Sequence, residues 1–210
     1  MHILDLEWND PIQKEVWKST ILHKIHKTHT RIFARKCNVV NVTAKTAKEF
    51  FKNNHLQGAA SGSQNLGLSY NGKLVSVATF SKSRFRKKQL NVFEILRFAS
   101  LINVSVIGSF SKIIKEFERT HSGTLVSYAN RRWSKGNVYQ QTRFTLAYST
   151  DPCYYYTNCK KLWHRSVFQK HKLKDLLDKF DQNKTEVANM YENNYRRIWD
   201  CGQLVYEKEM

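Results

Sequence analysis

The chain has 210 residues, enough for one large domain or two small ones, and 41% of them are hydrophobic and 13% aromatic. Lysine and arginine outnumber aspartate and glutamate by 35 to 17, which gives a formal net charge of +18. Such an excess attracts polyanions, and in an aromatic-rich chain it points first to nucleic acid. No apolar run approaches the roughly 20 residues that a membrane span needs, and the N-terminus lacks the basic start and apolar stretch of a signal peptide. We therefore expect a cytoplasmic protein without a membrane partner.

The four cysteines form neither a CxxC pair nor a dense disulfide pattern, so we expect reduced thiols. Cys153, Cys159, His164 and His171 could be imagined as zinc ligands, but their spacing matches no common zinc site. The sequence therefore predicts no metal site and announces no cofactor.

Hydrophobic spacing and turn residues predict alternating strands and helices. Asp10 before Pro11 is typical of a helix start, and Asn71-Gly72 between two strand-like segments is a strong hairpin signal. The order predicts a mixed α/β chain with a hairpin-rich middle. The predicted strands are residues 2–6, 31–37, 66–70, 73–80, 91–98, 124–128, 144–150 and 154–157, with 38–42 continuing 31–37 or pairing with it. The predicted helices follow Pro11 and cover 44–53, 107–121, 137–141 and 164–180, with a short helix after Thr185 and a final hairpin of 198–200 with 203–206.

The segment SYANRRWSKGNVYQQTRF, residues 127–144, places two arginines and a tryptophan on a predicted strand-to-helix loop. Such a loop could contact phosphate and stack on a base; the alternative is a core tryptophan with arginines in ion pairs. Two further basic segments, residues 81–89 and the helix at 164–180, could clamp a DNA backbone or enter a major groove; the alternative is a solvated charge run. The residues expected to bind nucleic acid are Lys82, Arg84, Arg86, Lys87, Lys88, Arg131, Arg132, Trp133, Lys135, Arg165, Lys170 and Lys172.

Several motifs in order resemble a group of phage homing-endonuclease-like proteins. They are RIFARKC, KEFFKNNHLQG, LGLSYNGKLVSVATF, EILRFAS, VSYANRRWSKGNVYQQTRF, KHKL and RIWDCGQLVYE, which span residues 31–207. The order of predicted elements also resembles the GNAT acyltransferase fold, and NVYQQTRF is similar to a late element of that family. The resemblance implies a GNAT-like, mixed and mostly antiparallel sheet flanked by helices, with a short N-terminal strand-helix extension.

The segment HILDLEWNDPIQKEVWKSTIL resembles the last strand and helix of a Vsr-like nuclease domain. The carboxylates and histidine of that family lie mostly upstream of this part. The resemblance therefore implies a nuclease remnant at residues 1–29, a GNAT-like domain at 30–158 and a basic helical extension at 159–210 that ends in a hairpin.

The GNAT-like part more distantly resembles phage Mom-type DNA-modification proteins. That resemblance implies an active centre at His55, Asn130 and Tyr139, with Asn130 in place of the family's aspartate. An amide cannot serve as a general base or as a strong anionic metal ligand. Acyl-CoA or a divalent metal could be bound, although only Gly108 stands where the fold's phosphate cradle uses several glycines.

We expect from these observations a DNA-binding protein related to homing endonucleases, with double-stranded DNA as its partner and the GNAT-like domain used for recognition. The alternatives are a nucleobase-modifying, acyltransferase-like enzyme that uses His55 and Tyr139, with Glu94 as a further candidate, or a binder of RNA or of an acidic protein. An enzyme predicts one pocket that joins His55 and Tyr139. A binder predicts one open basic face.

Overall fold

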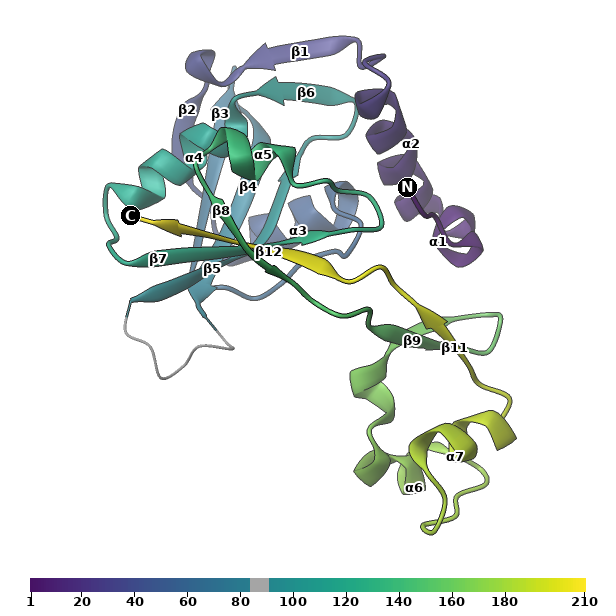
Figure 1. The fold of residues 1–210 in the computed structure, drawn as a ribbon. Helices are drawn as coiled ribbons and strands as arrows, with labels where there is room; N and C mark the ends of the chain where they lie inside the picture. Colours follow the sequence, from purple (N-terminus) through teal and green to yellow (C-terminus); the bar gives the residue numbers. More distant parts are fainter. Residues whose placement is uncertain (84–90) are drawn as a thin grey trace.

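The computed structural model describes residues 1–83 and 91–210. In these residues the largest element is a seven-stranded sheet with the order β2-β3-β4-β5-β7-β12-β8 (Figure 1). Neighbouring strands in it are antiparallel except β5 and β7, which are parallel. The predicted fold class, a mixed and mostly antiparallel sheet flanked by helices, is confirmed. The strands are β2 (Asn38–Asn41), β3 (Gln64–Tyr70), β4 (Lys73–Lys82), β5 (Val92–Ser100), β7 (Thr124–Asn130), β8 (Thr145–Ser149) and β12 (Gln203–Glu209).

Helices α3 (Ala44–Asn54) and α4 (Ser109–Glu118) cover opposite faces of this sheet. Phe51 of α3 lies in one apolar cluster with Val77, whereas Phe117 of α4 lies in another with Ala78 and Phe80. Val77 and Ala78 are consecutive in β4, so their side chains point to opposite faces. The Phe80 and Phe117 rings stack at 4.1 Å. The larger core therefore lies under α4.

The predicted hairpin at Asn71-Gly72 is confirmed, because Tyr70 of β3 pairs with Lys73 of β4. The predicted pairing or continuation of 31–37 with 38–42 is wrong. A 3-10 turn, Ala34–Lys36, separates β1 (Thr30–Phe33) from β2, and β1 pairs in parallel with β6 (Val104–Ile107).

The N-terminal segment forms two helices, α1 (Asp5–Asn9) and α2 (Pro11–Lys24). The start of α2 is as predicted, because the Asp10 carboxylate accepts from the backbone N–H groups of Ile12 and Gln13. The predicted strand at residues 2–6 is wrong. Asp5 and Glu7 lie in the first turn of α1, where carboxylates favour a helix. Of the nuclease-like strand and helix expected at this end, the helix is therefore observed as α2, and the strand is replaced by α1.

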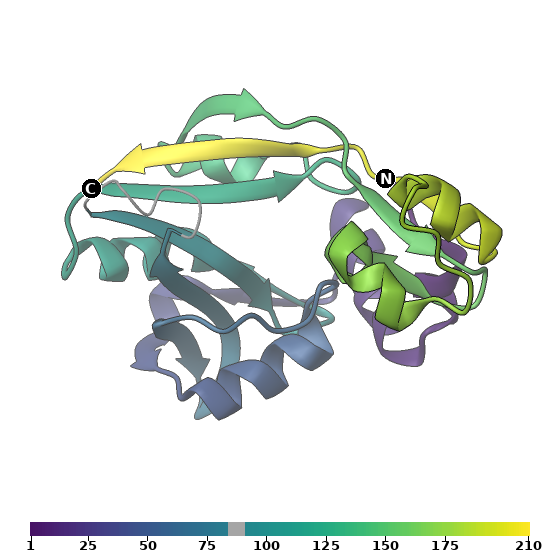
Figure 2. The ribbon, with the colours of Figure 1, turned by 90° about the horizontal axis from the view of Figure 1, so that it is seen from below.

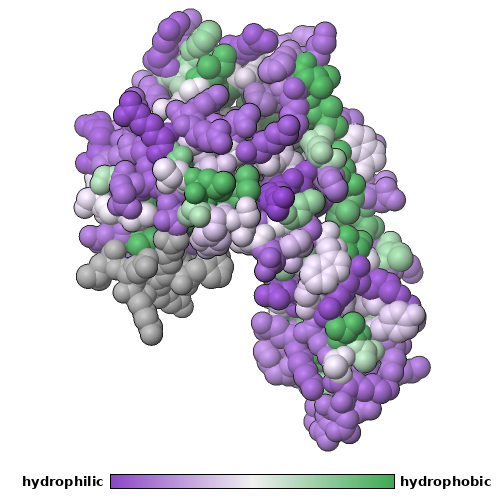
Figure 3. All heavy atoms as spheres, viewed as in Figure 1, coloured by the Kyte–Doolittle hydropathy of each residue, from purple (hydrophilic) through white to green (hydrophobic). Residues whose placement is uncertain are grey.

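A smaller lobe is inserted between β8 and β12, and Figures 1 and 2 show it projecting beyond the ends of these strands. Its core contains Tyr156, Phe168, Leu173 and Met190. Figure 3 shows that its outer end is mostly hydrophilic. The elements of this lobe are β9 (Tyr154–Thr157), β10 (Leu162–His164), 3-10 turns at Arg165–Phe168 and Lys170–Lys172, α6 (Leu173–Leu176), α7 (Glu186–Glu192) and β11 (Arg196–Trp199).

Two predictions about this region are wrong. The helix expected at 164–180 is broken at Gln169, whose extended backbone lets Phe168 and Leu173 turn into one core. The final hairpin does not form either, because β11 pairs with β9, while β12 pairs with β7 and β8.

Among the described residues we find no helix with the length and apolar character needed to cross a bilayer.

Candidate active site

A cavity opens where the two parallel strands of the sheet separate. β5 and β7 pair only from Val92–Ile95 with Thr124–Ser127, and in the described residues no ladder joins them beyond this point. Both strands continue, to Ser100 and to Asn130. The cavity between them has a volume of about 1090 Å³, and residues 95–98 and 127–130 line its two sides. An extended ligand could lie between these strand edges as a peptide does when it joins a sheet.

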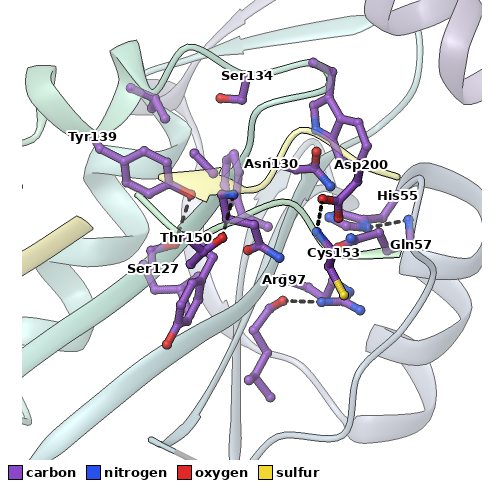
Figure 4. A pocket seen from close by; sticks show the side chains of 18 of the residues that line it. His55, Gln57, Arg97, Ser127, Asn130, Ser134, Tyr139, Thr150, Cys153 and Asp200 are labelled. Atoms are coloured by element: carbon purple, nitrogen blue, oxygen red, sulfur yellow. Dashed lines mark hydrogen bonds between the residues drawn. The ribbon is translucent and has the colours of Figure 1, made fainter. Parts of the chain in front are cut away.

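Tyr139 lies at the wall of this cavity, on α5 (Asn137–Gln141) (Figure 4). The Ser127 hydroxyl donates a hydrogen bond to its phenol oxygen at 2.9 Å. Its ring stacks on Tyr206 at 4.7 Å and contacts the edge of Phe110 at 5.4 Å. Burial raises the pKa of the Tyr139 phenol above its ordinary value. Because Ser127 donates to the oxygen, the phenol proton is available to a ligand, and Tyr139 can serve as a general acid.

Gly136 makes this arrangement of rings possible. It precedes α5 with a φ of +81°, and a Cβ at this position would lie 2.0 Å from the Tyr206 hydroxyl oxygen. A side chain would therefore be strained and would displace the ring on which Tyr139 stacks.

His55 lies at the C-terminal end of α3 and lines the same cavity. Its Nδ1 accepts from the backbone N–H of Gln57 at 3.1 Å, and its ring packs edge-on against Phe51 at 6.0 Å. Burial, with the Arg97 charge as a second cause, lowers the pKa of His55 to about 3. The imidazole is therefore neutral at physiological pH.

Arg97 holds the loop that comes after His55. Its Nε donates to the Gly58 carbonyl at 3.0 Å, and its Nη1 donates to the Leu96 carbonyl at 2.7 Å. It connects the chain after α3 to the wall formed by β5, and so keeps the His55 loop at the cavity.

A second cavity of about 510 Å³ shares five lining residues with the first: Gln57, Arg97, Trp133, Tyr155 and His164. It is lined by residues of α1, α2 and the small lobe. In residues 1–83 and 91–210 no group of three or more His, Cys, Asp or Glu side chains could hold a metal ion.

The three residues expected at an active centre, His55, Asn130 and Tyr139, all line the first cavity. Asn130 is buried, and its Oδ1 accepts from the backbone N–H of Arg132 at 2.9 Å. Its side chain thus closes a turn. Ser127 was not among the expected site residues, although it is a polar interruption in the apolar strand TLVSYAN.

The expected contact of Arg132 with phosphate is wrong, whereas Trp133 is half-buried and lines the first cavity. Arg132 is 5% exposed and forms a two-pronged ion pair with Glu7, with Nη2 to Oε2 at 2.6 Å and Nη1 to Oε1 at 2.9 Å. Trp133 packs edge-on against Trp17 at 5.7 Å. Both side chains therefore attach the loop to α1 and α2. The carboxylate partner was missed because it lies 125 residues away in the sequence.

The other residues expected to bind nucleic acid lie on both the main domain and the small lobe, and two of them, Lys135 and Arg165, line the first cavity. Arg165, Lys170 and Lys172 are exposed on short 3-10 turns of the small lobe, so no groove-binding helix presents them. Lys82, Arg131 and Lys135 lie on the main domain, and all three are exposed. Arg84, Arg86, Lys87 and Lys88 lie outside the described residues.

No family model matches this chain, and no curated protein matches it. Solved structures similar to it include an acetyltransferase from Bacillus subtilis in complex with CoA, at 12% identity and a TM-score of 0.48, with 83% of this chain and 99% of that chain covered. Another is the ribosomal-protein-S18-alanine N-acetyltransferase from Escherichia coli, at 11% identity and a TM-score of 0.49, with 82% and 93% covered. A third is a GNAT family acetyltransferase from Elizabethkingia anophelis with acetyl-CoA bound, at 12% identity and a TM-score of 0.42, with 83% and 99% covered.

All three similar structures are acetyltransferases, and two of them hold CoA or acetyl-CoA. The main function expected from the sequence, a DNA-binding relative of homing endonucleases, is corrected by the structure, in which Arg132 is buried in an ion pair with Glu7 and short 3-10 turns replace the expected groove-binding helix.

Proposed function

We propose that this chain is an acyltransferase that moves an acyl group from a thioester donor of the acyl-CoA type to an amine. One observation supports the proposal most directly: the parallel strands β5 and β7 separate after Ile95 and Ser127, and the gap leads to the half-buried side chain of Tyr139. The alternative expected from the sequence, an acyltransferase-like enzyme, required a pocket joining His55 and Tyr139, and one cavity contains both.

The residues present fit such a donor. The amide-bearing arm of acyl-CoA is extended and can hydrogen-bond to strand edges, which residues 95–98 and 127–130 provide on two sides. The ten-residue helix α4 begins after Gly108, whose φ is +79° and where a Cβ would meet only Ala34 at 3.8 Å. Backbone N–H groups at such a helix start favour phosphate. The side chain of Lys112 in α4 has a structural role, because its ammonium donates to the backbone carbonyls of Ala34 and Cys37.

In the proposed reaction the amine nitrogen attacks the thioester carbonyl carbon, a C–N bond forms and the C–S bond breaks. Tyr139 gives its phenol proton to the departing thiolate, and the proton lost by the amine returns to the phenoxide through solvent. The Ser127 hydroxyl steadies the phenol oxygen during both changes of charge.

The acceptor that we propose is the amine of a nucleobase. The support is chemical: the net charge of +18 concentrates polyanions near the protein, and Tyr155 and Trp133 give the cavity aromatic walls. A nucleobase amine also enters the reaction uncharged at neutral pH, as nucleophilic attack requires.

The test measures donor binding and acceptor modification separately. Calorimetry with acetyl-CoA should show saturable binding, and acetyl-CoA labelled in the acyl group should transfer label to an oligonucleotide but not to one without exocyclic amines. Tyr139→Phe should retain donor binding and lose most transfer. Absence of acetyl-CoA binding would overturn the proposal, whereas donor binding with label on another amine would replace only the acceptor.

A further inference from the structure

The geometry points to His55 as a hydrogen-bond donor that selects the acceptor, rather than as the base that deprotonates it. This inference rests on the proposed function. It depends on which of the two ring nitrogens of His55 remains available to a ligand.

The orientation of the His55 ring is determined by its own turn. The backbone N–H of His55 donates to the Phe51 carbonyl at 3.0 Å, and the Gly58 N–H donates to the His55 carbonyl at 2.9 Å. The ring rests edge-on against Phe51, which is fully buried. Arg97 holds the next residues through the Gly58 carbonyl at 3.0 Å. Rotation of the imidazole would break the bond from Gln57 to Nδ1 and the contact with Phe51.

The bond from Gln57 determines the tautomer. A backbone N–H can only donate, so Nδ1 must present its lone pair to Gln57 at 3.1 Å. In a neutral imidazole the single proton then lies on Nε2. The low pKa of about 3 agrees with a ring that stays neutral. In the part of the chain that the structure describes, no protein group hydrogen-bonds to Nε2, and His55 lines the cavity.

A neutral ring in this tautomer offers a ligand an N–H and no lone pair. To accept a proton from the acceptor, it would have to give up the bond from Gln57 and become a cation next to Arg97, whose charge opposes this state. It can donate readily to a carbonyl oxygen or to a ring nitrogen. The acceptor class is therefore an amine with a lone-pair atom beside it, as in an aminopyrimidine or aminopurine, rather than an alkyl amine.

Two variants test the two ring nitrogens of His55 separately, because each variant replaces only one of them. In His55→Asn the amide oxygen can replace Nδ1 and accept from Gln57, but no donor reaches the position of Nε2. In His55→Gln the longer amide carries an N–H to about the position of Nε2. Both keep a neutral polar side chain, and melting temperatures within a few degrees of the wild type would show that both fold.

The measurement is kcat/KM for label transfer from acetyl-CoA to a cytosine oligonucleotide and to its 3-deazacytosine counterpart, which keeps the amine and lacks the ring nitrogen. We expect His55→Gln to stay within about threefold of wild type, and His55→Asn to fall about three- to tenfold on cytosine, the factor of one ordinary hydrogen bond. The wild type should lose a similar factor on the deaza probe, and His55→Asn should lose nothing further on it.

A base would behave differently. Losses of about 10²- to 10⁴-fold in both variants, together with loss of a limb in the pH profile, would overturn the donor role. Acetyl-CoA binding is measured in parallel on all three proteins. If the wild type does not bind acetyl-CoA, the proposed function is wrong. If acetyl-CoA binding persists and both variants lose transfer by these large factors, only the role of His55 is wrong.

Discussion

The cavity wall and the small lobe both contain tyrosines in hydrogen bonds, but the tyrosines play different roles in these bonds. In the small lobe, the Tyr154 and Tyr156 hydroxyls donate to the same Glu186 oxygen at 3.0 and 2.9 Å, and Arg197 stacks over Tyr154 at 4.0 Å. At the cavity, Tyr139 accepts from Ser127 and keeps its own proton available.

Burial raises the pKa of Tyr156 to about 12 and also raises that of Tyr139. A raised tyrosine pKa therefore does not identify an acid catalyst. What distinguishes the two regions is the direction of the hydrogen bonds: the phenol proton of Tyr156 is committed to a carboxylate, and that of Tyr139 is not.

The largest expected effect separates these two tyrosines. Tyr139→Phe should lower kcat for acyl transfer by about 10²- to 10⁴-fold, because the leaving thiolate loses its proton donor. Tyr156→Phe is the matched control and should leave kcat unchanged, since Tyr156 lies in the core of the small lobe. Steady-state rates of both variants provide the comparison, and equal losses would show that Tyr139 has a structural role only.

The buried ion pair that anchors the cavity loop should have the next largest effect. Glu7→Ala leaves the guanidinium of Arg132 buried without its carboxylate, which should lower the free energy of unfolding by about 3–5 kcal/mol. Glu15→Ala removes the exposed partner of Lys18 and should cost about 1 kcal/mol or less. Urea unfolding of both variants measures the difference, and a small loss for Glu7→Ala would mean that water reaches Arg132.

A smaller effect is expected from the packing of the cavity tyrosine. Gly136→Ala adds a methyl group against Tyr206, and Gly72→Ala meets nothing within 4 Å at a similar positive φ. Both share the backbone strain, so the difference between them isolates the collision, for which overpacking predicts about 1–3 kcal/mol. Only Gly136→Ala should also lower acyl transfer. Equal losses of stability and unchanged transfer in both would show that the Tyr206 ring moves aside without consequence for Tyr139.

The smallest expected effect is a pH dependence of stability from His55. Its pKa is lowered to about 3 in the folded protein, whereas an unfolded histidine takes up a proton near pH 6.5. Below pH 6.5 the unfolded chain therefore binds the extra proton, and stability falls as the pH drops toward 3. Urea unfolding at pH 7 and pH 5 should show a smaller fall for His55→Gln than for the wild type. Identical falls would indicate that His55 is protonated in the folded state.

The sequence predicts elements well where the signal is local. Asn71-Gly72 contains its own turn, and Asp10 and Thr43 each cap a helix through a backbone N–H two or three residues ahead. The sequence predicts elements poorly where their pairing depends on a segment far away in the chain. The segment after Cys201-Gly202 looks like half of a hairpin, but its two neighbours in the sheet come from β7 and β8.

The same distinction holds for the site. His55, Asn130 and Tyr139 could be named through a resemblance of motifs, and they line one cavity. The roles of Arg132 and Ser127 could not be predicted, because each depends on one hydrogen-bond partner in another element: Glu7 in α1 and Tyr139 in α5.

The insertion point of the small lobe has a consequence for how such a chain can diversify. Thr150 N–H donates to the Gln203 carbonyl at 2.8 Å, and Gln203 N–H donates to the Thr150 hydroxyl at 2.9 Å, so β8 and β12 are joined before the chain enters the lobe. The register of the sheet is therefore set independently of the lobe. Yet Cys153, Tyr155 and Asp200, at the lobe's entry and exit, line the cavity together with residues of β5. Exchanging one insert for another would therefore alter which acceptors can enter the cavity. The strands that would hold the donor would stay unchanged.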